Sequence, residues 1–355
     1  MAIAFHKLKV QDIRKETPEA VSIAFEVPQD LKEDFEFIPG QYLTLKTTIN
    51  QEEVRRSYSI CSGINDGELR VAIKKVEEGK FSTYANEVLK VGEHIEVMPP
   101  TGKFTIDLQT DHDKQYVAFA AGSGITPIMS IVKSVMETEP NSSFILFYGN
   151  KGIDSIIFHE EIEALKNTYL NRLSVHHILS REKLQSDLFF GRIDGEKTEK
   201  FSNLFFSKDV IDDYYLCGPY DMIMGVKESL TQLGVDKKAI HFELFTTPGE
   251  AKKIKKKSKV ESFVAEITIQ MDGNTFEVKL KNDDESILDT ALKTGADLPF
   301  ACKGGVCATC KAKIESGRVE MDVNYGLEED EVEAGYVLTC QSHPITQKVT
   351  VNFDA

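Results

Sequence analysis

Residues 1–105 alternate apolar and polar positions over short segments such as AVSIAFEV and ELRVAIKKV, which glycine- and proline-containing turns separate. This alternation predicts strands, because successive side chains of a strand point to opposite faces of a sheet. Many short strands at even spacing predict a small antiparallel barrel. The six strands are expected at 7–16, 20–27, 41–49, 55–62, 68–76 and 94–100. One helix is expected over 81–89, with Ser82 as its N-terminal cap.

The pattern changes near residue 113, where continuous apolar runs begin to alternate with helical stretches. The helix expected after Pro127 repeats its apolar residues at the helical period. These residues are Ile128, Ile131, Val132, Val135 and Met136. Strand–helix alternation of this kind predicts a parallel sheet with helices on both faces.

A lysine-rich segment, 246–262, has little to bury and is expected to be an exposed linker. Beyond it, VAEITIQMDGNTFEVKL alternates on both sides of Asp272-Gly273, which predicts a hairpin. A helix around 286–295, a cysteine-rich loop and two strand-like runs follow. The expected fold is therefore multidomain, with an antiparallel β-barrel (1–110), an α/β domain with a parallel sheet (111–246), a linker (247–262) and a small C-terminal domain (263–355).

Charge and composition exclude several functional classes. The 355-residue chain has 28% charged residues and a formal net charge of −15, so its overall field does not favour nucleic acid. It has no apolar run long enough to span a membrane and no N-terminal secretory signal. We expect a cytoplasmic protein without membrane or nucleic-acid partners. The C-terminal domain holds most of the negative charge, which can steer a basic partner protein.

The clustered cysteines carry the strongest chemical signal. Cys302, Cys307 and Cys310 follow the spacing C-x4-C-x2-C, and Cys340 comes later in YVLTCQ. In a chain without an export signal, such clustering indicates metal ligands rather than disulfides. Zinc sites favour two separated C-x2-C pairs, which this pattern lacks. The spacing is that of plant-type 2Fe–2S ferredoxins, with zinc or a disulfide as the alternatives.

The segment LPFACKGGVCATCKAKIESG…YVLTCQ resembles the plant-type ferredoxin domain. The resemblance covers roughly residues 263–355. It implies a β-grasp fold and a 2Fe–2S cluster held by all four cysteines.

A short polar motif, Arg56-Ser57-Tyr58-Ser59, ends an expected strand. An arginine pairs with a diphosphate through its forked guanidinium, and a tyrosine stacks on a flat ring. Together with the barrel and the later glycine loop, the motif resembles the ferredoxin–NADP reductase superfamily across residues 1–245. The resemblance implies that Arg56 binds the flavin diphosphate, that Tyr58 stacks on the isoalloxazine, and that Ser59 approaches N5. Ser57 is also expected to bind the cofactor.

A second cofactor segment is expected between residues 73 and 83. Its glycine turn feeds a helix N-terminus, where N–H groups and the helix dipole attract an anion; an ordinary helix cap is the alternative. The superfamily resemblance implies a second phosphate-binding segment, and its length favours FAD over FMN. The implied contacts are Ile73, Lys74, Gly79, Phe81, Ser82 and Thr83.

The segment AAGSGITP follows an expected strand and opens a helix. Gly122 and Gly124 permit close backbone approach, and the helix start attracts a phosphate. The segment resembles the superfamily's NAD(P) loop, which implies that Thr126 contacts the nicotinamide side. Ser180 and Arg181 are expected to hold the 2′-phosphate of NADPH.

Some of these expectations have alternatives. Glu182, next to Arg181, leaves NADH open, and Arg192 is a second candidate for the phosphate contact. The resemblance implies that Cys217, Gly218 and Pro219 flank the nicotinamide C4 atom.

The resemblance also implies which residues act at the reacting atoms. Tyr58, Ser59 and Cys217 are expected at the catalytic centre, with Cys217 as a positioning residue. Glu243 and Phe245 are expected beside the flavin.

The histidines are not expected to bind a metal together. The eight histidines show no ligand spacing. His176 and His177 are adjacent on an expected strand, so their side chains point to opposite faces.

The three parts explain one another chemically. A nicotinamide delivers two electrons as a hydride, a 2Fe–2S cluster accepts one at a time, and a flavin couples the two. The domain order resembles the reductase components of multicomponent oxygenases, and the cysteine pattern resembles reductase subunits of phenylacetyl-CoA epoxidases. This implies a diiron oxygenase component as the electron acceptor. The alternatives are a reductase for another diiron or Rieske-type oxygenase, and a non-catalytic metal-binding redox sensor.

Overall fold

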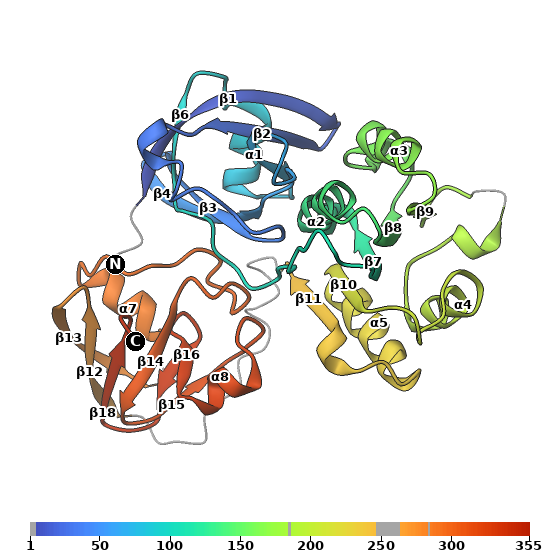
Figure 1. The fold of residues 1–355 in the computed structure, drawn as a ribbon. Helices are drawn as coiled ribbons and strands as arrows, with labels where there is room; N and C mark the ends of the chain where they lie inside the picture. Colours follow the sequence, from blue (N-terminus) through green and yellow to red (C-terminus); the bar gives the residue numbers. More distant parts are fainter. Residues whose placement is uncertain (1–4, 184–185, 246–262, 283–284) are drawn as a thin grey trace. The chain divides into compact units, whose positions relative to one another are not determined.

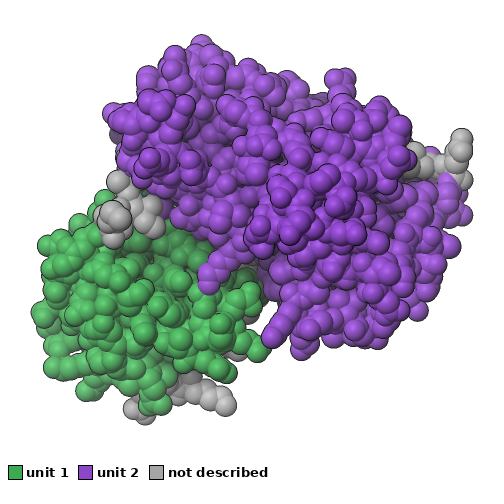
Figure 2. Space-filling view, in the orientation of Figure 1, with its two compact units in different colours: residues 1–5, 55–57, 246–355 green, residues 6–54, 58–245 purple. Residues whose placement is uncertain are grey.

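The computed structural model describes residues 5–183, 186–245, 263–282 and 285–355. The chain divides into two compact units, coloured separately in Figure 2. Unit 1 comprises residues 1–5, 55–57 and 246–355, and unit 2 comprises residues 6–54 and 58–245. The expected linker, 247–262, lies outside the described residues. Within the described ranges, no helix has the length and apolar character needed to cross a membrane.

The N-terminal part forms a six-stranded sheet in the order β4-β3-β6-β1-β2-β5 (Figure 1). All six strands that the alternation predicts are present. They are β1 (His6–Thr17), β2 (Ala20–Glu26), β3 (Tyr42–Ile49), β4 (Glu52–Ser59), β5 (Leu69–Lys74) and β6 (His94–Val97). Just beyond β4, Ile60 bridges to Val71 of β5, so the two outer strands meet. The predicted barrel therefore closes, around an aliphatic core that includes Leu8, Ile23 and Leu43.

The predicted helix is α1 (Lys80–Glu87), but the predicted cap is wrong. The residue before the helix is Gly79, which has extended backbone, and no side chain caps the helix. Ser82 lies inside the first turn, where its Oγ accepts from Val76 N at 3.2 Å and donates to Gly79 O at 3.2 Å. The helix begins earlier than the sequence pattern suggested, so Ser82 closes the preceding turn instead. A short 3-10 turn, η1 (Gln29–Leu31), links β2 to β3.

The middle of the chain forms a five-stranded sheet in the order β11-β10-β7-β8-β9, in which every neighbouring pair is parallel. Its strands are β7 (Gln115–Ala121), β8 (Ser143–Asn150), β9 (Leu173–Leu179), β10 (Asp213–Gly218) and β11 (Ile240–Leu244). Its helices are α2 (Ile125–Thr138), α3 (His159–Thr168), α4 (Gly195–Phe205) and α5 (Tyr220–Gln232). Short 3-10 turns lie at η2 (Gly122–Gly124), η3 (Ile153–Ser155), η4 (Asp187–Phe189) and η5 (Lys237–Ala239).

Helices cover both faces of this sheet, as predicted. Tyr116 and Ala118 of β7 pack in the same core cluster as Ile128 of α2. On the opposite face, Phe147 of β8 stacks on Phe201 of α4, with ring centroids 4.4 Å apart. Successive residues of one strand thus enter two different cores, which explains the continuous apolar runs.

The C-terminal part contains a sheet of order β13-β12-β18-β14-β16 and a separate β15-β17 pair. Its elements are β12 (Val264–Met271), β13 (Asn274–Lys281), α7 (Ile287–Lys293), β14 (Lys311–Ser316), β15 (Val319–Met321), α8 (Glu329–Glu333), β16 (Tyr336–Leu338), β17 (Ser342–Pro344) and β18 (Lys348–Asn352). The predicted hairpin is confirmed, and Asp272 and Gly273 have the positive φ values that its two-residue turn requires. The expectation of two strands after the cysteine loop is wrong, because there are five. Three of them span only three residues, too few for alternation to be visible.

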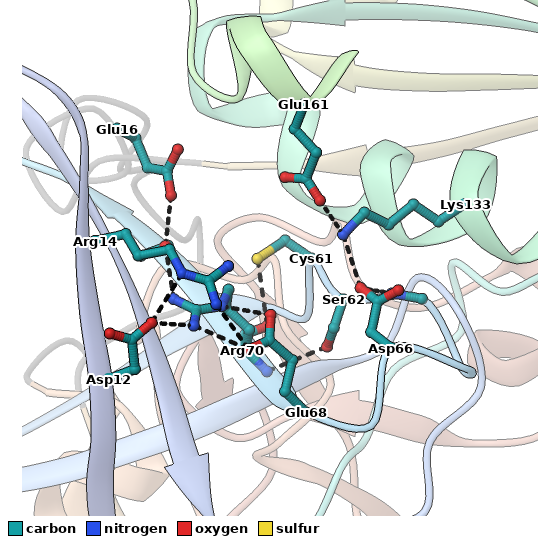
Figure 3. Close-up of polar contacts among 12 residues, drawn as sticks. Asp12, Arg14, Glu16, Cys61, Ser62, Asp66, Glu68, Arg70, Lys133 and Glu161 are labelled. Atoms are coloured by element: carbon teal, nitrogen blue, oxygen red, sulfur yellow. Dashed lines mark hydrogen bonds and ion pairs between the residues drawn. The ribbon is translucent and has the colours of Figure 1, made fainter. Parts of the chain in front are cut away.

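A buried cation holds three neighbouring barrel strands together (Figure 3). Arg70 of β5 is 3% exposed and donates to Asp12 of β1 at 2.6 Å and to Ser22 of β2 at 2.9 Å. It also pairs with Glu68 at 2.7 Å. A buried guanidinium is tolerated only where its N–H groups find acceptors, so this network specifies how the strands meet.

A second paired cation joins the barrel to the parallel-sheet layer within unit 2 (Figure 3). Lys133 of α2 is 7% exposed. It pairs with Asp66, which precedes β5, at 2.7 Å and with Glu161 of α3. The two layers of unit 2 are therefore linked by a nearly buried ion-pair network.

We expect Arg70→Met to destabilise unit 2 by about 3 kcal/mol, because it leaves carboxylates without their buried partner. The matched control is Arg14→Met, since Arg14 contacts the same two carboxylates but its side chain is 56% exposed. That change should cost less than about 1 kcal/mol. Urea unfolding monitored by far-ultraviolet circular dichroism checks both. Equal losses of unfolding free energy in Arg70→Met and Arg14→Met would contradict the importance of burial.

Candidate functional site

Two glycine-containing turns meet at the carboxyl ends of β7 and β10, where the strand order of the parallel sheet reverses. A Cβ atom on Gly124 would lie 2.1 Å from the carbonyl oxygen of Cys217, so only glycine fits there. Gly122 has φ of 55°. Its carbonyl accepts a hydrogen bond from the Tyr148 hydroxyl at 3.0 Å. Ligands of open α/β sheets bind in the crevice at such a switch point.

Two of the predicted nucleotide segments come together at these strand ends. Thr126 is buried in the first turn of α2, and its Oγ1 donates to Ser123 O at 3.0 Å. Gly218 ends β10 and Pro219 precedes α5. The tertiary structure thus brings the segments 122–126 and 217–219 together, although about ninety residues separate them in the sequence.

A serine and a glutamate from different sheets meet nearby within unit 2. The Ser59 Oγ donates to Oε2 of Glu243 at 3.1 Å. Glu243 lies in β11, directly opposite Cys217 of β10. Glu243 keeps part of its surface exposed, yet its carboxyl group is surrounded by protein atoms, and this desolvation raises its pKa from 4.5 to about 8. The carboxyl is therefore protonated at neutral pH and is able to hold and release a proton there.

The cysteine of this group is a neutral thiol. Burial, and then the charge of Glu243, raises the pKa of Cys217 well above its ordinary value. A thiol is a weak nucleophile compared with a thiolate. The environment of Cys217 therefore fits a positioning role.

The aromatic residues expected at the flavin lie in different environments. Tyr58 is half-buried and packs on Phe81, with ring centroids 5.5 Å apart. Phe81 is 1% exposed and belongs to the barrel core, so only its backbone is available to a ligand. Ile73 is likewise fully buried, whereas Phe245 is 38% exposed. Arg56 is half-buried in β4, and its Nη1 donates to Arg55 O at 2.7 Å.

A pocket of about 560 Å³ lies within unit 2. Lys74, Lys151 and Arg181 line it, and within the described ranges no side chain forms a hydrogen bond or ion pair with any of the three. Desolvation, and then the positive charge of Lys151, lowers the pKa of Lys74. Unpaired cations that share a pocket repel one another, so an anionic ligand would be stabilised among them.

Acidic groups line the same pocket, at Glu19, Asp154 and Glu182. The Glu182 carboxylate accepts from Ile153 N at 2.9 Å, so part of its charge is already satisfied by the backbone. Of the residues predicted for the 2′-phosphate, Arg181 lines the pocket, whereas Ser180 and Arg192 are not among its lining residues.

In unit 1 the four cysteines come together. The Sγ atoms of Cys302 and Cys307 lie 3.1 Å apart. A side-chain hydrogen bond with Cys340, then burial, raises the pKa of Cys310 well above its ordinary value, and the charges of Cys340 and Cys307 add to the shift. The cysteines therefore form one connected group of sulfur atoms drawn from the loop and from the turn after β16.

Backbone N–H groups point at these sulfur atoms. Gly304 N and Cys307 N donate to Sγ of Cys302 at 3.3 and 3.4 Å. Cys302 N donates to Sγ of Cys307 at 3.5 Å. A sulfur-rich cluster needs such donors, because they stabilise its negative charge. The residues present therefore fit a 2Fe–2S group.

Sequence reasoning missed several residues of these sites. Gln341 donates from Nε2 to Lys303 O at 3.0 Å and to Cys340 O at 3.0 Å, so it ties the cysteine loop to the fourth cysteine. Lys303 has a positive φ of 51°, which the sequence did not signal. Lys151 and Asp154 follow β8 and reach the pocket only through the fold. Their place after a parallel strand was the one available signal.

Three family descriptions match successive parts of the chain. Residues 7–106 match an oxidoreductase FAD-binding domain, residues 119–228 match an oxidoreductase NAD-binding domain, and residues 269–344 match a 2Fe-2S iron-sulfur cluster binding domain. Over 351 residues, the chain is 47% identical to a 1,2-phenylacetyl-CoA epoxidase subunit from Escherichia coli K12, covering 99% of this chain and 98% of that protein.

The chain belongs to the ferredoxin–NADP reductase superfamily, in the group with a C-terminal 2Fe–2S domain. The protein is thus an oxidoreductase, with domains for FAD, a nicotinamide nucleotide and a 2Fe–2S cluster. It is also 30% identical to the ferredoxin reductase component of 3-ketosteroid-9-alpha-monooxygenase from Rhodococcus rhodochrous, over 98% of this chain and 96% of that protein.

A solved structure confirms the arrangement of the fold. Phthalate dioxygenase reductase matches 98% of this chain and 98% of its own, with a TM-score of 0.61 and 21% identity. The predicted multidomain fold class is therefore confirmed, and the non-catalytic sensor is set aside because the chain carries both oxidoreductase domains.

The raised pKa of Glu243 makes a prediction about stability. Between pH 4.5 and pH 8 the carboxyl is ionised in the unfolded chain but protonated in the folded protein, so folding loses up to about 1.4 kcal/mol per pH unit as pH rises. Glu243→Gln removes this loss and keeps the shape of the side chain. We expect the melting temperature of the variant, relative to wild type, to increase from pH 5.5 to pH 8.

The control is Glu36→Gln, because Glu36 is exposed. Its melting temperature relative to wild type should not change with pH. A pH-independent difference for Glu243→Gln would contradict the raised pKa.

Proposed function

We propose that this protein transfers electrons from NADPH through FAD to a 2Fe–2S cluster, and from there to the diiron oxygenase component of a phenylacetyl-CoA epoxidase. The 47% identity to the E. coli epoxidase protein, along nearly the whole of both chains, is the observation that carries the proposal. The connected group of four cysteines supports the last step inside the protein. Relatives that serve other oxygenases are less similar, at 32% identity or below.

In this proposal Cys302, Cys307, Cys310 and Cys340 hold the cluster. The N–H groups of Gly304 and Cys307 stabilise the charge on the sulfur ligands. Gln341 holds the loop that carries three ligands against the fourth. The residues hold the metal as thiolates, which the donors around them favour.

The flavin site in this proposal uses the barrel and the switch point together. Bound FAD accepts a hydride and passes electrons on singly, which is the chemistry that must lie between a nicotinamide and the cluster. Arg56 contacts the diphosphate of FAD, with Gly79 and the first turn of α1 as the second phosphate contact, and Ser57 is a further cofactor contact. Tyr58 packs against the flavin ring. Ser59 and Glu243 hold a proton beside this ring, and Cys217 positions the nicotinamide.

The pocket with unpaired cations supports NADPH over NADH. Arg181, Lys151 and Lys74 all line it. The Nζ atom of Lys74 lies beside Gly122, 3.9 Å from where a Cβ atom would stand, so the pocket lies next to the nucleotide loop. A 2′-phosphate would supply an anionic partner for these three cationic side chains.

We expect Arg181→Ala to lower kcat/KM for NADPH roughly ten- to hundredfold, because charged hydrogen bonds are worth about 1.5–3 kcal/mol. The value for NADH should change little. Arg192→Ala is the matched control, since Arg192 lies outside the pocket lining. Steady-state ferricyanide reduction with each nucleotide checks this. An unchanged ratio of NADPH to NADH efficiency in Arg181→Ala would contradict the phosphate role.

Cys340→Ser tests the route of the electrons. We expect the variant to lose the iron and visible absorption of the cluster, yet to retain FAD and NADPH-driven ferricyanide reduction, because none of the proposed flavin contacts is a ligand of the cluster. Epoxidation of phenylacetyl-CoA with the purified oxygenase component should fall to background.

The control for this experiment is Cys61→Ala, which removes a buried thiol of the barrel. It should keep the iron and the coupled turnover. Delivery of electrons to the oxygenase by cluster-free Cys340→Ser would overturn the route. If wild type instead serves only a Rieske-type oxygenase in a panel of purified components, the named partner is wrong while the route stands.

A further inference from the structure

Two histidines and a glutamate gather within unit 2, and none of the three is among the residues assigned above. His159 and Glu163 are four residues apart in α3, so they share one face of the helix. His177 comes from β9, which contacts α3. One ligand atom from each residue can be chosen so that all three lie within 4.8 Å of one another.

The spacing of these atoms suits a tetrahedral metal. Nε2 of His177 lies 3.3 Å from Oε1 of Glu163. Metal–ligand bonds of about 2.0–2.1 Å place neighbouring ligands of a tetrahedral zinc ion roughly 3.3 Å apart. The half-exposed side chain of His159 supplies the third ligand atom, and rotation about its side-chain bonds can bring that atom closer to the other two.

The ring of His177 packs against two other rings, with its centroid 5.6 Å from that of His159 and 6.0 Å from that of Tyr148. Its side chain is 16% exposed. Its Nδ1 atom is buried and, among the described residues, has no hydrogen-bond partner. Its Nε2 contacts Glu163 at 3.3 Å. Nε2, which lies near Glu163, is therefore the nitrogen of His177 available to a metal ion shared with that carboxylate.

The neighbouring cation leaves the site intact. Lys166 contacts Oε2 of Glu163 at 3.3 Å, so Oε1 is the oxygen that faces His177. Ligating carboxylates are commonly held by a second partner in this way. Two histidines and one carboxylate leave a fourth position for water, because His159 and Glu163 remain open to solvent.

The geometry points to a binding site for one divalent transition-metal ion of the zinc class, with His159, Glu163 and His177 as its ligands. Imidazole and carboxylate together favour such ions over calcium or magnesium, which prefer oxygen ligands alone. The ion joins α3 to β9. The site is separate from the four cysteines, and it stands whether or not the proposed electron route is correct.

Titration calorimetry with zinc sulfate tests the site on the holoprotein, with FAD and the 2Fe–2S cluster intact. We expect wild type to bind one zinc ion per chain at this site. The variants His159→Asn, Glu163→Gln and His177→Asn should each bind it at least tenfold more weakly. Zinc should also raise the melting temperature of wild type but not of the three variants.

Two controls separate the metal site from its surroundings. Lys166→Gln breaks the same ion pair as Glu163→Gln but keeps all three ligands, so it should bind zinc at least as tightly as wild type. His94→Asn removes an exposed histidine elsewhere and should change nothing. Constant cluster absorption during the titration shows that zinc does not displace iron.

Three outcomes would overturn the site. The first is that wild type takes up no zinc. The second is that His159→Asn and Glu163→Gln take up as much zinc as wild type. The third is that Lys166→Gln abolishes zinc uptake. If His177→Asn fails to fold, the two α3 variants decide the question, because both residues are partly exposed.

Discussion

The close approach of the first turn of α2 to the end of β10 is the constraint on which the site in unit 2 depends. No side chain fits at Gly124, because the carbonyl of Cys217 occupies the space. This contact brings the two glycine-containing turns into one crevice. The pairing of β10 with β11 then places Glu243 opposite Cys217, and the barrel supplies Ser59 to the same carboxyl group. One backbone contact thus positions residues from three segments.

Five cations of unit 2 illustrate two different uses of positive charge. Arg70 and Lys133 are nearly buried and paired with carboxylates, and they hold strands and layers together. Lys74, Lys151 and Arg181 line a pocket without such partners among the described residues. Burying a charge without compensation is unfavourable, so Arg70 and Lys133 keep carboxylate partners, whereas the three cations of the pocket are half-buried or exposed and can take an anionic ligand.

The cysteine motif predicts the sulfur ligands but not the residues that support the loop. C-x4-C-x2-C identified three sulfur atoms and their chemistry, and the later Cys340 completed the set. The supports of the loop were not visible in the motif, since Gln341 and the positive φ of Lys303 act through contacts across the domain. The errors have a similar cause. Ser82 looked like a cap because serine prefers that position, but the helix starts at Lys80, and strands of three residues carry no period.

The sequence by itself determined the order of the three domains, the strands of the barrel, the parallel sheet and the four cysteines. Periodicity and ligand spacing are local properties, so they can be read along the chain. Only the tertiary structure decided which side chains meet across segments. It paired Ser59 with Glu243, gathered the three unpaired cations around one pocket and brought His177 to the face of α3. These contacts depend on strand order and on desolvation, which no local pattern of residues records.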